Sequence, residues 1–123
     1  MQTVLIDTDV AIDYLRGSKE AAEILGSLWK NNTAYLSILS AYELYADMRP
    51  AEKDDTENFI NACTIEPVTM KIAKSAGEIY RRWRAKGKTL TSIYCMIAAT
   101  ASINNHKIAT RNRDHYPEEG LLL

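Results

Sequence analysis

Short apolar runs alternate with amphipathic segments along the chain. Apolar runs rich in β-branched residues predict buried strands, and apolar residues three and four positions apart predict helices with one buried face. The expected strands are residues 1–6, 33–38, 64–68 and 107–110, with 121–123 as a candidate edge strand. The expected helices are residues 10–16, 19–30, 39–48, 70–86 and 93–103, with a further helical segment after Pro50.

Polar residues and glycines mark the ends of these helices. Ser18, Thr69 and either residue of the pair Thr91–Ser92 are expected N-caps, because a hydroxyl accepts a hydrogen bond from the first helical turn. Gly17 and Gly87 are expected to end the first and the longest helix. The expected N-caps and glycines therefore agree with the helix ends that the apolar pattern indicates.

Strands that alternate with helices predict a single α/β domain over residues 1–123. Each strand–helix–strand crossover makes its two strands parallel and lays its helix on one face of the sheet. We therefore expect a three-layer α/β/α sandwich around a short central parallel sheet of four or five strands. No linker or internal repeat interrupts the pattern.

Composition narrows the class of protein. Of the 123 residues, 46% are hydrophobic and 25% charged, which argues against a disordered or disulfide-framed chain. No apolar run approaches the roughly 20 residues that a membrane span needs and no signal-peptide pattern opens the chain, so no membrane contact is expected. Cys63 and Cys95 are expected to be buried thiols in a reducing cytoplasm. His106 and His115 have no metal-ligand spacing and are expected to be structural or exposed.

The net charge of −1 is a cancellation between two halves of the chain. Residues 1–66 carry 5 basic and 12 acidic side chains, whereas residues 67–123 carry 10 basic and 4 acidic ones. A split of this kind within one small domain indicates an acidic site beside a surface that binds anions.

The acidic residues of interest follow the strands, where sites form in parallel sheets. Asp7 follows the first strand, Glu43 lies one turn into the helix after the second, and Asp114 lies four residues past the fourth. Carboxylates about 4 Å apart repel by about 4 kcal/mol at an effective dielectric near 20, so their convergence requires a divalent cation. Oxygen ligands suit Mg²⁺ or Mn²⁺. Asp9 is expected to be a helix N-cap.

A basic stretch near the end of the longest helix is the candidate anion surface. No acid interrupts it, and two further arginines precede Asp114 in the later segment. Clustered Arg and Lys beside an acidic metal site suit a phosphodiester backbone, although a solvated helix end is the alternative. Tyr80 and Trp83 fall on the apolar stripe of the helix and are expected to be core residues. The candidate phosphate contacts are Arg81, Arg82, Arg84, Lys86, Arg111 and Arg113.

Four segments together resemble the PIN-domain family, and within it the small toxin ribonucleases of the VapC type. These segments are Val4–Asp9, Ser37 with Tyr42–Leu44, Ile97–Ala101 and Ala109–Asp114. The resemblance runs over essentially the whole chain. It implies a PIN-like fold and a Mg²⁺- or Mn²⁺-dependent endoribonuclease that cleaves structured RNA such as tRNA.

The resemblance also implies particular residues and partners. Asp7, Glu43 and Asp114 match three of the four acids that hold the metal in the family. Thr8, Ser37 and Asn112 match polar residues found around that metal. The implied partners are a VapB-like antitoxin, whose tail enters the acidic site, and a second copy of the chain in a homodimer and in larger toxin–antitoxin assemblies. Exposed Tyr42, Tyr45 or Trp29 are candidates for the antitoxin contact.

The fourth acid of the family is absent. The family carries an aspartate three residues before the isoleucine that corresponds to Ile97, and this chain has Tyr94 there. No shift of register supplies it, because no Asp or Glu lies between Glu78 and Asp114. Tyr94 is then either an inactivating substitution in a lethal toxin or the mark of a protein that binds without cleaving. We favour the first interpretation, because the other site residues are intact.

A different enzyme class also matches the first site segment. Asp7-Thr8-Asp9-Val10 after a strand satisfies the DxDx[TV] pattern of phosphatases, with Asp7 as nucleophile and Asp9 as acid. That family also needs a later lysine and a late acidic pair, and Asp54–Asp55 comes too early. The phosphatase interpretation is therefore disfavoured.

Overall fold

The computed structural model describes residues 1–123 and has the predicted alternation of strands and helices. The elements in chain order are β1 (Val4–Ile6), α1 (Thr8–Leu15), α2 (Lys19–Lys30), β2 (Ala34–Ser37), α3 (Ile38–Asp47), the 3₁₀ turn η1 (Pro50–Glu52), α4 (Lys53–Ala62), β3 (Thr64–Glu66), α5 (Met70–Ala85), α6 (Ser92–Asn104), β4 (Lys107–Ala109) and the 3₁₀ turn η2 (Arg113–His115). The candidate edge strand at residues 121–123 is reduced to one parallel bridge between Leu122 and Ile108. None of the helices combines the length and the apolar character that crossing a membrane requires.

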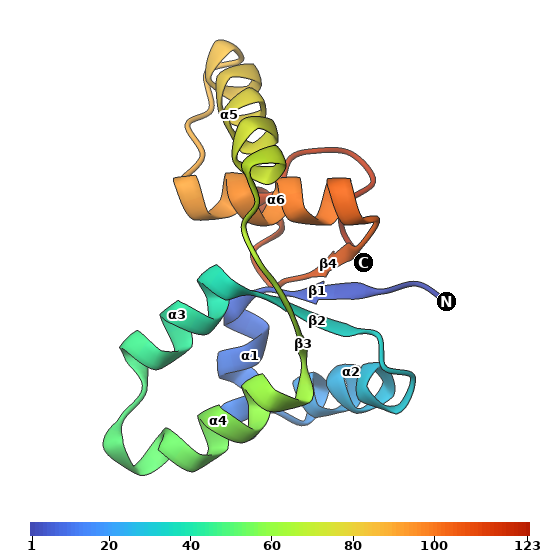
Figure 1. The fold of residues 1–123 in the computed structure, drawn as a ribbon, viewed down its shortest axis with the longest axis vertical. Helices are drawn as coiled ribbons and strands as arrows, with labels where there is room; N and C mark the ends of the chain where they lie inside the picture. The colour runs from blue at the N-terminus through green and yellow to red at the C-terminus, as the bar shows by residue number, and fades with distance from the viewer.

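Four parallel strands form the central sheet in the order β3-β2-β1-β4. Helices α1 to α4 lie on one side of this sheet, and α5 and α6 lie on the other (Figure 1). The predicted three-layer α/β/α sandwich is therefore confirmed. Strand β1 is internal, with Val4 opposite Ala34 on one side and Lys107 on the other.

Alternating side chains of the strands feed two separate cores. Val4 and Ile6 of β1 pack with the helices α1 to α4, whereas Leu5 packs with α5 and α6. All three are at most 1% exposed, because successive residues of a strand point to opposite faces and both faces are covered. Cys63 and Cys95 are buried free thiols, one in each core, as predicted.

The predicted helix boundaries hold where a hydroxyl or a glycine sets them. Ser18, Thr69 and Thr91 each accept a hydrogen bond from a backbone N–H in the first turn of their helix, so Thr91 rather than Ser92 caps α6. Gly17 and Gly87 have φ values of 89° and 87°, a left-handed conformation that glycine adopts without strain.

The strand order β3-β2-β1-β4 reverses at β1, and the carboxyl end of such a strand is where parallel α/β sheets form a binding crevice. Strand β2 lies on one side of β1 and β4 lies on the other, so the segments leaving these strands diverge at this point. The backbone N–H of Asp7 donates to the carbonyl of Ala109 at 2.9 Å, which brings the segments after β1 and β4 together. This crevice is where the predicted acids are expected to meet.

Buried His106 should make the fold sensitive to acid. Its ring lies 4.5 Å from that of Tyr35, and its Nδ1 is 2.6 Å from the Thr3 hydroxyl. Burial lowers the pKa of His106 below the usual 6.5, although Glu66, 3.7 Å from Nε2, opposes the shift. The unfolded chain then binds a proton at a higher pH than the folded chain, so stability falls as the pH drops below about 6.5.

We therefore expect His106→Asn to flatten the decline of the melting temperature between about pH 7 and pH 5. Asparagine retains a polar group that can pair with Thr3 and does not titrate. Thermal unfolding of both proteins across this range tests the prediction. Parallel pH profiles for the two proteins would contradict it.

Candidate functional site

Asp7 is the centre of the crevice. It follows β1, is only 3% exposed and is the N-cap of α1. One carboxylate oxygen accepts from the backbone N–H of Thr8 and the other from the hydroxyl of Thr110, each at 2.8 Å. Burial raises the pKa of Asp7 and the charge of Asp9 raises it further, while these two hydrogen bonds oppose the shift. The fold thus holds an acid in an environment that disfavours its charge.

Glu43 reaches the same crevice from α3, as predicted. Its Oε1 accepts a hydrogen bond from the Thr8 hydroxyl at 2.6 Å, which ties α3 to the first residue of α1. Ser37 is 1% exposed, and its hydroxyl caps α3 by accepting from the N–H of Leu39 at 3.1 Å. Ser37 therefore orients the helix that carries Glu43.

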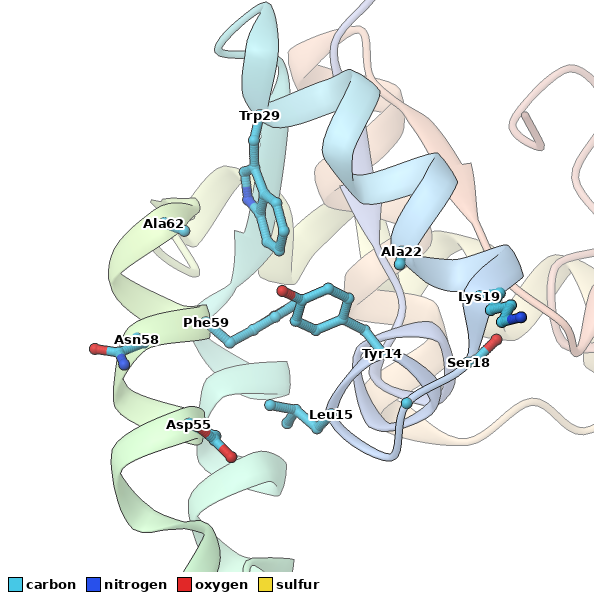
Figure 2. A pocket seen from close by; sticks show the side chains of 11 residues that line it. Tyr14, Leu15, Ser18, Lys19, Ala22, Trp29, Asp55, Asn58, Phe59 and Ala62 are labelled. Atoms are coloured by element: carbon cyan, nitrogen blue, oxygen red, sulfur yellow. The ribbon is translucent and has the colours of Figure 1, made fainter.

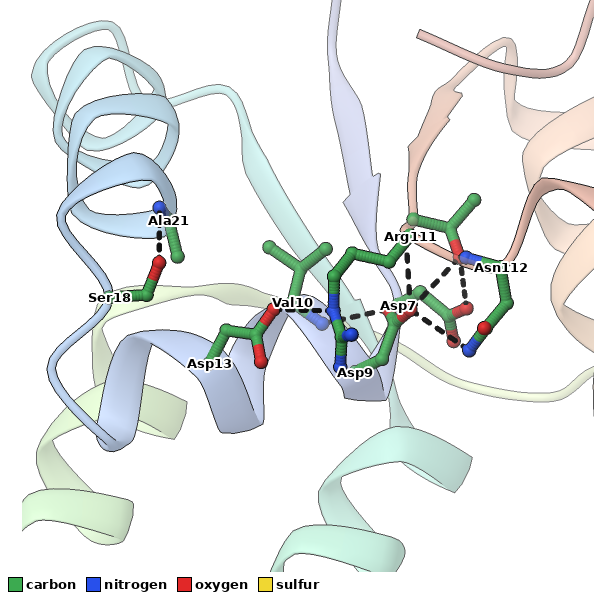
Figure 3. A network of polar contacts seen from close by, with 9 residues as sticks. Asp7, Asp9, Val10, Asp13, Ser18, Ala21, Arg111 and Asn112 are labelled. Atoms are coloured by element: carbon green, nitrogen blue, oxygen red, sulfur yellow. Dashed lines mark hydrogen bonds and ion pairs between the residues drawn. The ribbon is translucent and has the colours of Figure 1, made fainter.

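Asp9 is not the helix cap that the sequence predicted. Helix α1 begins at Thr8 rather than Val10, and Asp7 caps it. This places Asp9 within the first turn, where its carboxylate accepts hydrogen bonds from the segment that follows β4 (Figure 3). The amide of Asn112 is one of these donors. Asp9 is thus a site residue that sequence reasoning set aside as a cap.

Tyr94 faces the acids from the first turn of α6. Burial raises the pKa of its hydroxyl, and the charges of Asp7, Glu43 and Asp9 raise it further in that order. The hydroxyl therefore stays neutral at physiological pH, within electrostatic reach of three carboxylates.

An aromatic cluster surrounds Tyr94. Its ring stacks on His115 with centroids 4.0 Å apart and meets Tyr116 edge-on at 5.5 Å. Tyr116 is 2% exposed, and its hydroxyl makes no hydrogen bond. Burial raises the pKa of Tyr116, and the charge of Asp7 adds to the shift. Sequence reasoning missed both residues; the only signal was an aromatic pair inside the polar loop beside Asp114.

Asp114 does not join the group, contrary to the prediction. It lies in η2, its side chain is exposed, and it forms no hydrogen bond or ion pair. The backbone of this short turn directs His115, the next residue, toward Tyr94 instead. Spacing along the chain could not reveal which residue of the turn faces inward.

The residues of this sequence do not fit a metal ion. No three Asp, Glu, His or Cys side chains lie close enough together to hold one. Protein donors already bind carboxylate oxygens of Asp7, Asp9 and Glu43, and the neighbouring tyrosine supplies no negative charge. Asp7, Asp9 and Glu43 therefore lie in one region of the molecule but do not form a set of metal ligands.

The predicted phosphate contacts differ in whether an acidic side chain already pairs with them. Arg82 pairs with Glu118, and Arg111 pairs with Asp13 through Nε and Oδ2 at 2.6 Å. Arg81 and Arg113 are exposed and form no ion pair. The remaining two, Arg84 and Lys86, are exposed beside aromatic rings of α5.

Two aromatic residues of α5 pack against the core and also lie beside cations of the basic surface. Trp83 and Tyr80 are half-buried against the core formed with α6, as the apolar stripe predicted. Lys86 Nζ lies 4.5 Å from the centre of the Trp83 ring, and the Arg84 guanidinium carbon lies 6.0 Å from that of Tyr80. The rings thus support part of the basic surface.

A separate cavity of about 540 Å³ lies between the start of α2 and α4, on the α1–α4 side of the sheet (Figure 2). Tyr14, Trp29 and Phe59 line it, with ring centroids 5.1 to 5.8 Å apart. Of the three candidates for the antitoxin contact, Trp29 is half-buried, whereas Tyr42 and Tyr45 on α3 are 66% and 40% exposed. This side of the molecule therefore offers apolar surface outside the acidic crevice.

Asp7→Asn is expected to stabilise the fold at neutral pH. A raised pKa means that folding disfavours the ionised carboxylate, and asparagine removes this cost while remaining a good N-cap. Chemical denaturation at pH 7 should show a higher midpoint for the variant. Asp114→Asn, at an exposed residue without contacts, should leave the midpoint unchanged; an unchanged or lower midpoint for Asp7→Asn would contradict the prediction.

Three comparisons place the chain among known proteins. The family model described as PIN domain matches residues 4–117. Ribonuclease VapC19 of Mycobacterium tuberculosis is 36% identical over 114 residues, which are 92% of this chain and 91% of that protein. Ribonuclease VapC10 of the same organism is 34% identical over 114 residues, covering 93% and 86% of the two chains. A toxin–antitoxin complex from Klebsiella pneumoniae shares the fold with a TM-score of 0.83 at 19% identity, over 98% of this chain and 96% of that one.

Proposed function

The chain belongs to the PIN domain family, and from this membership we propose that it is a toxin ribonuclease of the VapC type whose cleavage is disabled by Tyr94. With an aspartate at position 94, cleavage of structured RNA such as tRNA would depend on Mg²⁺ or Mn²⁺. The observation that carries the proposal is the surroundings of the Tyr94 hydroxyl, whose pKa is raised by burial and by the charges of Asp7, Glu43 and Asp9. A neutral side chain at this point leaves a ribonuclease-like acidic site without one of its charges.

The basic surface supports RNA as the substrate. Arg81, Arg84 and Lys86 on the last turns of α5 form no ion pair with an acid, so they are available to phosphates. Arg113 likewise forms no ion pair and lies in η2, the turn that also carries His115. Arg82 and Arg111 would contribute only if RNA displaced their carboxylate partners.

We propose a VapB-like antitoxin as the protein partner and a homodimer as the toxin unit, acting in the cytoplasm. The named VapC relatives and the toxin–antitoxin complex of the same fold support the antitoxin. The exposed Tyr42 and Tyr45 on α3 and the cavity beside Trp29 are candidate contacts, because they present apolar surface to solvent.

The test is expression of the chain beside its Tyr94→Asp variant in a bacterial host without the antitoxin. The variant should arrest growth and the purified variant should cleave RNA when Mg²⁺ is supplied, whereas the parent should do neither. Co-expression of the antitoxin should restore growth. A folded variant that cleaves no RNA would contradict the proposed ribonuclease.

A second candidate function is a PIN-like module that binds antitoxin or RNA without cleaving. It is favoured by the absence of any group of three side chains that fits a metal ion. The Tyr94→Asp variant separates the two, because a binding module would gain neither metal affinity nor cleavage. The match to the PIN domain model over residues 4–117 favours both over the phosphatase interpretation of Asp7 and Asp9.

A further inference from the structure

The segment Thr110–Asn112 crosses the carboxyl end of β1 and is attached there to the first turn of α1 (Figure 3). Asp9 Oδ2 accepts from the backbone N–H of Arg111 at 2.9 Å and from the side-chain amide of Asn112 at 3.0 Å. The other oxygen, Oδ1, accepts from the N–H of Val10 at 2.7 Å. Both oxygens of one carboxylate are therefore engaged, one by its own helix and one by the crossing segment.

The same segment holds the hydroxyl that reaches Asp7. Thr110 Oγ1 donates to Asp7 at 2.8 Å and accepts from the N–H of Asn112 at 3.0 Å. It is also 3.4 Å from Asp9 Oδ2. A continuous set of hydrogen bonds thus runs from Asp9 through Asn112 and Thr110 to Asp7.

We propose that Asp9 is a positioning residue of the site: its carboxylate fixes the Thr110–Asn112 segment, and through it the hydrogen bond from Thr110 to Asp7. The kinetic consequence rests on the proposed ribonuclease function, but the structural role does not. Asp9 touches no reacting group in this role and acts only through its neighbours.

A carboxylate suits this role better than an amide, because both of its oxygens accept, one from Val10 and one from the crossing segment. Asparagine at position 9 would offer one acceptor oxygen and one amide donor. If the oxygen stayed on Val10, the amide would face the N–H of Arg111, which can only donate. The side chain of Asn112 can rotate to accept from that amide, but the backbone N–H of Arg111 would lose its partner.

Asp13 provides a matched comparison one turn along α1. It contacts the same segment, through an ion pair with the Arg111 side chain at 2.6 Å. The two side chains are 28% and 64% exposed, so solvent screens this pair and it should contribute little. If acidic charge on α1 were all that mattered, Asp9 and Asp13 would be equivalent.

Amide hydrogen exchange of the full chain tests the structural role. Asp9→Asn should accelerate exchange of the Arg111 N–H by about tenfold or more, and Asp13→Asn by less than about twofold. Asn112→Ala removes the side-chain amide that donates to Asp9 and should also accelerate exchange of the Arg111 N–H, by a smaller factor. This variant tests the role of Asp9 if Asp9→Asn does not fold. Unchanged exchange in Asp9→Asn, or equal acceleration in Asp13→Asn, would overturn the proposal.

Kinetics in the Tyr94→Asp background test the consequence for the site. There, Asp9→Asn should lower kcat for RNA cleavage by about tenfold while KM changes by less than about twofold, because the segment positions Asp7 rather than binding substrate. The exchanged pair Asp9→Asn with Asn112→Asp restores a side-chain hydrogen bond between the two positions and should recover part of the lost kcat. Unchanged kcat in Asp9→Asn would count against the positioning role. Inactivity of Tyr94→Asp itself would refute the proposed function, and the exchange experiment would still decide the role of Asp9.

Discussion

Cleavage of structured RNA in the presence of Mg²⁺ is expected to rise at least about a hundredfold when Tyr94 is replaced by aspartate. The Tyr94 hydroxyl lies within electrostatic reach of Asp7, Glu43 and Asp9, and its pKa is raised, so it adds no negative charge to theirs at neutral pH. An aspartate is smaller and would add a carboxylate at a position that already senses the charges of Asp7, Glu43 and Asp9. Such a set of oxygen ligands suits Mg²⁺. Initial cleavage rates with Mg²⁺ and with a chelator measure the effect.

Metal binding gives a readout that does not depend on cleavage. Four carboxylates repel one another until a cation binds, so Mg²⁺ should raise the melting temperature of Tyr94→Asp and leave that of the parent unchanged. Tyr94→Phe keeps a ring that can stack on His115 and should remain inactive. Adding Asp7→Asn to Tyr94→Asp should abolish the gain. Absence of both the Mg²⁺ stabilisation and the cleavage in a folded Tyr94→Asp protein would refute this account of position 94.

Leu5→Ala is expected to destabilise the fold by about 2 to 5 kcal/mol, the largest stability effect of the substitutions considered. Leu5 is fully buried on the internal strand β1, between the sheet and the helices α5 and α6. Truncation removes buried apolar surface and leaves a cavity that the rigid strand cannot close. Because a domain of this size is stable by only about 5 to 15 kcal/mol, this is a large share of the total.

Urea denaturation of the two proteins measures this loss. Met70→Ala is the matched control, because Met70 is 85% exposed and its truncation should change the free energy of unfolding by less than about 0.5 kcal/mol. A loss below about 1 kcal/mol for Leu5→Ala would mean that the core beside β1 closes around the gap. Since Asp7 lies two residues further along, the same variant should also loosen the site.

The elements of the fold were predictable because their signals are local. The alternation of apolar runs and amphipathic segments depends on which residues lie a few positions apart, and so do the caps at Ser18, Thr69 and Thr91. The proximity of Asp7 and Glu43 was also predictable, since Asp7 directly follows β1 and Glu43 lies on the helix that directly follows β2. The bridge at Leu122 was overestimated as a strand, because three apolar residues do not specify how many will pair.

The errors at the site have a common cause. Aspartate is both a good N-cap and a good acceptor for a distant segment, and Asp7 and Asp9 compete for the first role in the sequence. The structure assigns the cap to Asp7, so Asp9 is available to the residues after β4. In the short turn η2 the side chain directed inward is His115 rather than Asp114, and no periodic pattern marks that choice.

By itself the sequence determined the α/β architecture and the acidic residues, Asp7 and Glu43, at the carboxyl edge of the sheet. It also determined the separation of charge between the two halves of the chain. Only the tertiary structure decided which acids share the crevice, which cations are neutralised by partners such as Glu118 and Asp13, and which aromatic rings stand beside Tyr94. The physical reason is the separation along the sequence. Hydrophobic patterning acts over a few residues. The contacts at the site join side chains far apart in the chain: Asp9 and Asn112 are 103 positions apart, and Arg82 and Glu118 are 36.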